Sequence, residues 1–170
     1  MERKNMITMH GNPLTLVGNE IKAGDKAPDF SVLDAGLAEK SLADYKGKVK
    51  LISVTPSLDT PVCDLQVNRF EKDATNLSSD VVVLNISVDL PFAIKRFCST
   101  GRIDRVTALS DHRYISFGEA YGVHIKELRL LARSIFVIGK DDIVRYVQVV
   151  SEQTNEPDYE AAMAAVKSSI

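Results

Sequence analysis

The sequence predicts an α/β fold in which a mixed central sheet is flanked by helices. Two observations indicate this class. Apolar runs of strand length at Val49–Val54 and Val81–Val88 are each followed by a segment with helical periodicity. Closer to the C-terminus, two more apolar runs are separated by a short polar turn and followed by an amphipathic segment. Strand–helix units that lead into a hairpin and a closing helix are typical of a mixed sheet with helices on both faces.

The size and composition are those of one globular domain. The chain has 170 residues, of which 45% are hydrophobic and 26% charged, so it can bury a core without disulfides or a metal. Its net charge of −2 lacks the basic excess of a nucleic-acid-binding protein. No apolar run reaches the roughly 18 residues of a membrane helix, and no signal peptide is apparent. We therefore expect one cytoplasmic domain over residues 1–170, with an N-terminal extension over residues 1–20.

The first part of the chain predicts a hairpin, a loop and a strand. Met6–Met9 and Leu14–Val17 flank His10–Pro13, which predicts a small hairpin with a four-residue turn. Gly24–Asp29 is interpreted as a loop that leads into a short strand at Phe30–Leu33.

The middle of the chain predicts two strand–helix units. Lys46–Lys50 is interpreted as a solvated turn before the buried strand Val49–Val54. Pro61–Leu77 has an apolar stripe at helical spacing and predicts a helix. Val81–Val88 predicts a second buried strand because β-branched residues dominate it. Pro91–Thr100 predicts a helix that ends at the glycine after it.

The last part predicts a short helix, a hairpin and a terminal helix. Ile115–Tyr121 is interpreted as the short helix. Ser134–Ile138 and Ile143–Val150 predict two strands joined by the turn Gly139–Asp142. Tyr159–Ser169 predicts an amphipathic helix. The complete order of elements is compatible with a thioredoxin-like arrangement.

The most informative chemistry lies in Thr55–Cys63, which connects a buried strand to a helix. If Thr60 caps that helix, Pro61 is its first residue and Cys63 falls in its first turn. Unpaired backbone N–H groups and the helix dipole favour a thiolate there, and the Thr60 hydroxyl could face its substrate. The alternative is that Cys63, which lies on the apolar stripe of the helix, is a buried structural thiol.

The second cysteine, Cys98, lies near the end of the next predicted helix. The chain has no Cys-x-x-Cys motif, and two isolated cysteines make a poor zinc site. The pair could instead run a redox cycle in which Cys63 attacks a peroxide, becomes a sulfenic acid and condenses with Cys98. Their Cα atoms must come within roughly 7 Å for that disulfide, so helix ends must unwind if they start farther apart. Cys98 adjoins Phe97, so it could equally be a buried, inert thiol.

The third element is Arg133, at the start of the predicted strand Ser134–Ile138. A guanidinium that enters an apolar strand is costly to bury without a partner. A thiolate would be a suitable partner. The alternative for Arg133 is a surface ion pair.

On these residues the sequence resembles the peroxiredoxin superfamily, and within it the bacterial thiol peroxidase family of atypical two-cysteine enzymes. The superfamily motif Pro-x-x-x-Thr-x-x-Cys is present as Pro56, Thr60 and Cys63. Further similar segments extend over essentially the whole chain: Gly11–Pro13, Gly24–Phe30, Ser87–Ala93, Arg96–Cys98, Ala132–Ser134 and Glu156–Ala162.

The resemblance implies a role for five residues. Cys63 matches the peroxidatic cysteine, and Cys98 matches the resolving cysteine that forms an intramolecular disulfide with it. Thr60 matches the threonine that hydrogen-bonds the peroxide and the thiolate. Pro56 matches the proline that shields the pocket, and Arg133 matches the arginine that stabilises the thiolate and the transition state.

The resemblance also implies a thioredoxin-like fold, a homodimer and reduction by thioredoxin. It implies a preference for organic hydroperoxides over hydrogen peroxide. No metal, haem or flavin is implied, and neither a nucleic acid nor a membrane is expected as a partner.

Three alternatives remain open at this stage. One is a one-cysteine or bacterioferritin-comigratory type of peroxiredoxin, which a disulfide map would separate from the two-cysteine type. A second is a redox sensor that switches partners when its disulfide forms. A third is a thioredoxin-fold binding module in which both thiols are buried and inert.

Overall fold

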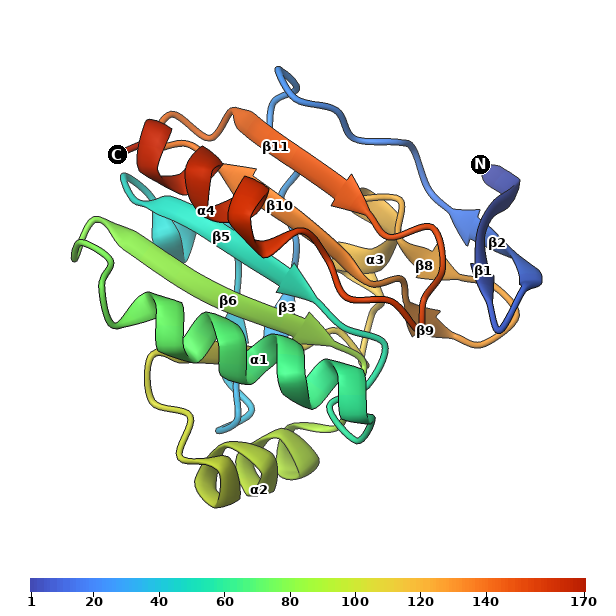
Figure 1. Ribbon diagram of the computed structural model, residues 1–170, viewed down its shortest axis with the longest axis horizontal. Coiled ribbons are helices and arrows are strands. Elements are labelled where there is room, and N and C mark those ends of the chain that lie inside the picture. The colour runs from blue at the N-terminus through green and yellow to red at the C-terminus, as the bar shows by residue number, and fades with distance from the viewer.

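The computed structural model describes residues 1–170 and contains a seven-stranded sheet with the order β11-β10-β5-β6-β7-β3-β4 (Figure 1). The centre of this sheet is parallel, from β5 through β6 to β7, and β10 runs antiparallel beside β5. The predicted mixed sheet is therefore confirmed. Its strands are β3 (Val32–Leu33), β4 (Glu39–Lys40), β5 (Val49–Val54), β6 (Val81–Ser87), β7 (Val106–Ser110), β10 (Ser134–Ile138) and β11 (Val144–Val149).

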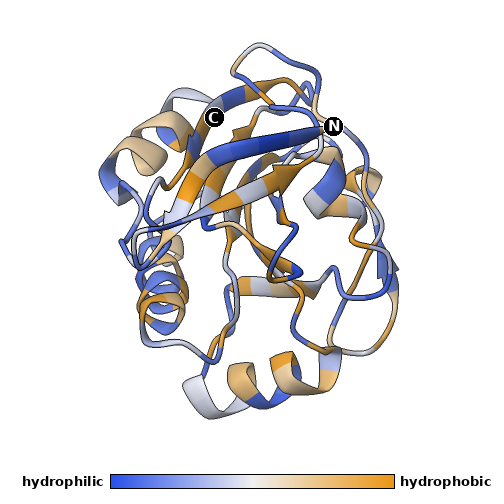
Figure 2. Ribbon diagram, turned by 90° about the vertical axis from the view of Figure 1, so that its right-hand side faces the viewer, coloured by the Kyte–Doolittle hydropathy of each residue, from blue (hydrophilic) through white to orange (hydrophobic).

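Helices cover both faces of the sheet, as predicted (Figure 1). The helices are η1 (Leu42–Tyr45), α1 (Pro61–Ala74), α2 (Pro91–Gly101), α3 (Ser116–Ala120) and α4 (Tyr159–Ser168). On one face, α1, α2 and α4 pack Phe70, Ile94 and Val166 into one apolar cluster. On the other face, α3 contributes Phe117 to a second cluster, which also contains Phe136 of β10. In Figure 2 the inner strands are mainly hydrophobic, whereas the N-terminal strand is hydrophilic. No helix is long and apolar enough to cross a membrane.

A second, four-stranded sheet has the order β1-β2-β8-β9 and carries the predicted hairpin. Its strands are β1 (Glu2–Met9), β2 (Asn12–Val17), β8 (His124–Ile125) and β9 (Leu130–Leu131). The predicted four-residue turn was wrong, because Asn12 and Pro13 belong to β2 and pair with β1. The turn is His10-Gly11, with φ angles of 51° and 78°. Positive φ at both central residues matches the twist of the flanking strands.

Two features differ from the sequence prediction: β7 was not predicted, and Lys50 does not lie in a turn. Val106–Ser110 is short and mixes Thr107 and Ser110 with apolar residues, so its strand pattern is weak. Lys50 is not part of a solvated turn, because it lies in β5 and its side chain is fully buried. Its Nζ forms an ion pair with Asp142, which follows β10 at the same end of the sheet.

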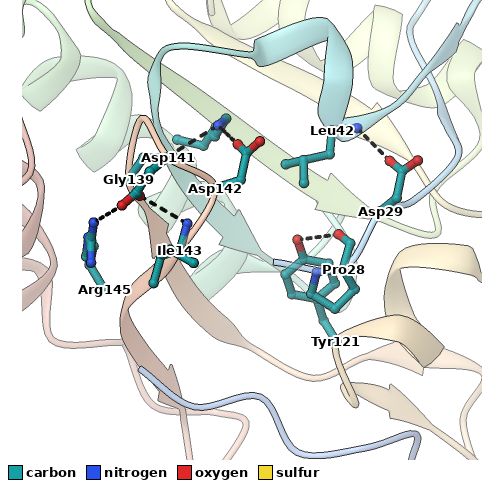
Figure 3. Close-up of polar contacts among 10 residues, drawn as sticks. Pro28, Asp29, Leu42, Tyr121, Gly139, Asp141, Asp142, Ile143 and Arg145 are labelled. Atoms are coloured by element: carbon teal, nitrogen blue, oxygen red, sulfur yellow. Dashed lines mark hydrogen bonds and ion pairs between the residues drawn. The ribbon is translucent and has the colours of Figure 1, made fainter. Parts of the chain in front are cut away.

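Hydrogen bonds join the loops at this end of the sheet to one another (Figure 3). The Tyr121 hydroxyl donates to the Pro28 carbonyl at 2.9 Å. The Asp29 carboxylate accepts from the Leu42 N–H at 3.1 Å, and the Ala27 N–H donates to the Asp142 carbonyl at 2.8 Å. Four of the five residues selected from the sequence lie at the opposite end, where β5 ends and β10 begins: Pro56, Thr60, Cys63 and Arg133.

Candidate active site

Cys63 is the third residue of α1 and is fully buried. Thr60 is the N-cap with an extended backbone (φ −120°, ψ 148°), and Pro61 is the first helical residue, as predicted. The Thr60 hydroxyl does not cap the helix, because it donates to the Ser57 carbonyl at 3.2 Å. The geometry therefore confirms a cysteine in the first turn, at the strand-to-helix connection.

Arg133 is the contact partner of Cys63. Its Nη2 lies 3.4 Å from the Cys63 Sγ, and the residue is only 3% exposed. The register explains the encounter: Ser134 of β10 lies opposite Val54 of β5, so the residue before β10 reaches the end of β5. The alternative of a surface ion pair for Arg133 is excluded by its burial.

Two glutamines complete the surroundings of the Arg133 guanidinium. Nη1 donates to Gln66 Oε1 at 2.8 Å, and Nε donates to the Gln153 carbonyl at 3.0 Å. The Gln153 side chain also accepts from the Arg133 backbone N–H and donates to the Val150 carbonyl at 2.7 Å. Because every contact is made in the buried interior, these bonds offset the cost of burying the charge and fix the direction of Nη2.

A chain of buried polar side chains extends from Gln66 into the sheet. Gln66 Nε2 donates to the Ser53 hydroxyl at 2.7 Å, and Asn85 Nδ2 donates to the Ser53 carbonyl at 3.2 Å. These residues were not predicted from the sequence as part of the site. Their signal was the polar residues that interrupt the two apolar runs, and in α1 a glutamine three positions after Cys63 on the same stripe. Gln153 carries no such signal, because it lies in a loop.

Pro56 and Thr60 lie on the connection that ends at Cys63. Pro56 is buried directly after β5, and Thr60 is half-buried at the cap of α1. Four of the five residues selected from the sequence therefore gather at one end of the sheet.

Cys98 is the fifth, and it does not contact Cys63. It lies in α2, is half-buried, and both cysteines are free. A cavity of about 300 Å³ lies between residues 58–64 and α2. Burial, with a smaller contribution from the Glu71 carboxylate, raises the pKa of the Cys98 thiol.

No group of three or more His, Cys, Asp or Glu side chains gathers to hold a metal ion. His10 lies in the exposed hairpin turn, and the ring of His112 pairs with the Ser110 hydroxyl at 3.0 Å. His124 is buried in β8 without a hydrogen-bond partner on its ring.

Fold and site together define a class of protein. It combines a mixed sheet covered by helices with one thiol, which is buried at a helix start and contacts a guanidinium at the end of β5. Reactive cysteines in proteins occur in surroundings of this kind, at helix starts and beside cationic side chains.

The comparisons with known proteins agree with this class. The Redoxin family model matches residues 22–163. A thiol peroxidase of Bacillus subtilis is 59% identical over 161 residues, which cover 95% of this chain and 96% of the relative. A thiol peroxidase of Halalkalibacterium halodurans is 58% identical over 164 residues, with 96% and 98% covered. The crystal structure of a peroxiredoxin-like protein from Aquifex aeolicus superposes with a TM-score of 0.92, at 43% identity and 98% coverage of both chains.

The chain belongs to the redoxin family, and within it to the peroxiredoxin-type thiol peroxidases. The thioredoxin-like fold expected from the sequence is confirmed with it.

Proposed function

We propose that this thiol-dependent peroxidase reduces hydroperoxides at Cys63. The observation that carries the proposal is the 3.4 Å contact between Arg133 Nη2 and the Cys63 Sγ inside a buried polar network. The thiolate attacks the outer oxygen of the peroxide, the O–O bond breaks, and Cys63 becomes a sulfenic acid. The leaving oxygen takes a proton and departs as alcohol or water. Arg133 stabilises the negative charge of the thiolate and of the leaving oxygen.

In the second step, the Cys98 thiolate attacks the sulfur of the Cys63 sulfenic acid. The S–O bond breaks, water leaves, and an intramolecular disulfide forms. Because Cys63 faces Arg133 and Cys98 lies on α2, the connection before α1 or the helix α2 must move first. Thr60 would hydrogen-bond the peroxide, and Pro56 would shield the thiolate from water; both roles rest on the motif.

We further propose that thioredoxin returns the disulfide to two thiols by thiol–disulfide exchange. A cycle that depends on such a reductant fits the cytoplasm, where thiols are kept reduced. Organic hydroperoxides are the preferred substrates in this proposal, which rests on the similarity of the whole chain to thiol peroxidases. We also expect a homodimer. The side chains of Leu90 and Phe92, 54% and 69% exposed, would be candidates for its interface.

The proposal is tested by two substitutions in a peroxidase assay coupled to thioredoxin. Cys63→Ser should abolish turnover, because no other thiol has an arginine partner. Cys98→Ser should still consume one equivalent of peroxide but should not be recycled by thioredoxin. Full turnover in the Cys63→Ser variant would contradict the proposal.

A further inference from the structure

We propose that Asp89 is a positioning residue: its carboxylate holds the connection before Cys63 against the start of α2 and so slows disulfide formation. We call these contacts the Asp89 latch. The inference rests on the proposed function, because it concerns the step that joins Cys63 and Cys98. Asp89 is half-buried and lies between the end of β6 and Pro91, the first residue of α2.

The Asp89 carboxylate binds groups from both sides of the region that must move. Its Oδ1 accepts from the Ser57 hydroxyl, and its Oδ2 accepts from the Leu58 backbone N–H, both at 2.8 Å. Oδ2 also accepts from the Ser87 hydroxyl at 2.8 Å, at the end of β6. Hydrogen bonds to an ionised acceptor are shorter and stronger than neutral ones. One carboxylate therefore ties the connection to the strand that leads into α2.

The contacts continue from Ser57 toward the helix that carries Cys63. The Ser57 hydroxyl accepts from the Asp59 N–H, and the Ser57 carbonyl accepts from the Thr60 hydroxyl, each at 3.2 Å. Leu58 is 5% exposed and belongs to the apolar cluster that also contains Ile94 of α2. The Asp89 latch therefore fixes the backbone of residues 57–60, directly before α1.

The latch opposes the movement that the disulfide needs. Asp64 of α1 and Phe97 of α2, the neighbours of the two cysteines, line the cavity of about 300 Å³ between these elements. A disulfide brings two Cα atoms within roughly 7 Å of each other. In this proposal the connection is the part that moves: it leaves its place beside Asp89, and the bonds from Ser57 and Leu58 to Asp89 break.

The strength of the latch then determines which of two reactions the Cys63 sulfenic acid undergoes. If the latch holds, a second hydroperoxide can oxidise the sulfenic acid to a sulfinic acid, and the hydroperoxide leaves as an alcohol. If the latch opens, Cys98 attacks the sulfenic sulfur and water leaves. A weaker latch should therefore give more disulfide and less sulfinic acid.

The direct test is Asp89→Asn, which keeps the shape of the side chain but replaces one acceptor oxygen with an NH₂ group. We expect disulfide formation to be about tenfold faster, which corresponds to about 1.4 kcal/mol. The sulfinic fraction of Cys63 at a fixed excess of cumene hydroperoxide should fall accordingly. Both quantities are measured by rapid mixing, acid quenching and mass spectrometry of the intact protein. The reaction of Cys63 with the first peroxide should be no faster than in the unmodified chain.

The matched control is Asp59→Asn, which removes the same charge from the same cavity and has no side-chain bond to the connection. Ser57→Ala should raise the ratio of disulfide to sulfinic acid, but by less than Asp89→Asn does. Ser57→Thr, which keeps a hydroxyl, should leave this ratio as it is in the unmodified chain. An unchanged ratio in Asp89→Asn, a shift toward sulfinic acid, or an equal shift in the Asp59→Asn control would overturn the latch. If Asp89→Asn does not fold, the comparison of Ser57→Ala with Ser57→Thr tests the latch by the same ratio of disulfide to sulfinic acid. Failure of the unmodified chain to form the disulfide would overturn the proposed function itself.

Discussion

At the scale of single residues, the site depends on how Arg133 is held. The sequence could predict Cys63 and Arg133, because a thiol at a helix start and a cation entering an apolar strand both need a chemical explanation. It could not predict Gln66 and Gln153 as the partners of Arg133. Those contacts depend on which segments the fold brings together, and a buried glutamine is satisfied by many different neighbours.

Gln66 allows the support of Arg133 to be tested. In Gln66→Leu, Arg133 Nη1 loses its acceptor in a buried place. An unpaired buried group of this kind costs about 1–3 kcal/mol, so we expect a free energy of unfolding lower by that amount. The reaction of Cys63 with peroxide should slow by about tenfold as Nη2 loses its direction, an effect equivalent to about 1.4 kcal/mol. Asn68→Ala, on the exposed side of the same helix, is the control. Equal reaction rates in the two variants would contradict the supporting role of Gln66.

The raised pKa of Cys98 predicts the pH dependence of the second step. Its causes are burial first and then the Glu71 carboxylate, and both disfavour the thiolate. Because the thiolate is the attacking species, disulfide formation should accelerate about tenfold for each pH unit until pH passes the raised pKa. Stopped-flow measurements of disulfide formation between pH 6 and 9 check this. A rate that levels off near neutral pH would contradict it.

At the scale of elements, short and mostly apolar runs were predicted best. The strands Val49–Val54 and Ser134–Ile138 have the bounds expected from the sequence, because buried strands leave a predominantly apolar signal. β8 and β9 were missed because two-residue strands carry no periodicity. The end of α2 also differs: Gly101 is its last residue, and Arg102 adopts the left-handed conformation (φ 54°) after it. Hydrogen bonding at the Cys98 carbonyl, which accepts from the Ile103 N–H at 3.0 Å, fixes that end.

The N-terminal hairpin is attached next to the residue that supports Arg133. Glu152 accepts from the Thr8 hydroxyl at 2.7 Å and from the Gly11 N–H at 3.0 Å. The neighbouring Gln153 N–H donates to the Thr8 carbonyl at 2.8 Å. The hairpin therefore packs against the segment that holds Arg133 through Gln153.

The attachment of the hairpin should depend on acid pH. The Thr8 hydroxyl, followed by the Gly11 N–H, lowers the pKa of Glu152 from 4.5 to about 2. Because the pKa of Glu152 is lower in the folded state, its carboxylate stabilises the attachment of the hairpin above about pH 4.5. This stabilisation is lost as the pH falls toward 2. The amide NMR shift of Gly11 should therefore titrate with a midpoint near 2, and Glu152→Gln should remove that titration. A midpoint at the ordinary value of a glutamate would show that the contact is absent in solution.

At the scale of the whole molecule, the two ends of the sheet have separate tasks. The end at Thr55 and Arg133 carries the thiol chemistry, whereas the end at Lys50 and Asp142 joins β5 to the β10–β11 turn (Figure 3). Breaking a buried ion pair from one side leaves a charge without a partner.

This separation predicts a stability defect without a catalytic one. Asp142→Ala should lower the free energy of unfolding by about 3 kcal/mol, because Lys50 is fully buried. Lys140→Ala, which breaks the exposed pair with Asp80 at the same turn, should cost less than about 1 kcal/mol. Urea unfolding measures both, and the reaction of Cys63 with peroxide should be unchanged in each variant. A slowed reaction in Asp142→Ala would mean that the two ends are coupled.

The most direct test of the whole account is a titration of free thiols in the fully reduced chain, before and after one equivalent of cumene hydroperoxide. We expect the loss of both thiols and a Cys63–Cys98 link in the peptide map. Two thiols that persist after prolonged exposure would mean that the contact with Arg133 does not activate Cys63, and would contradict the proposed peroxidase cycle.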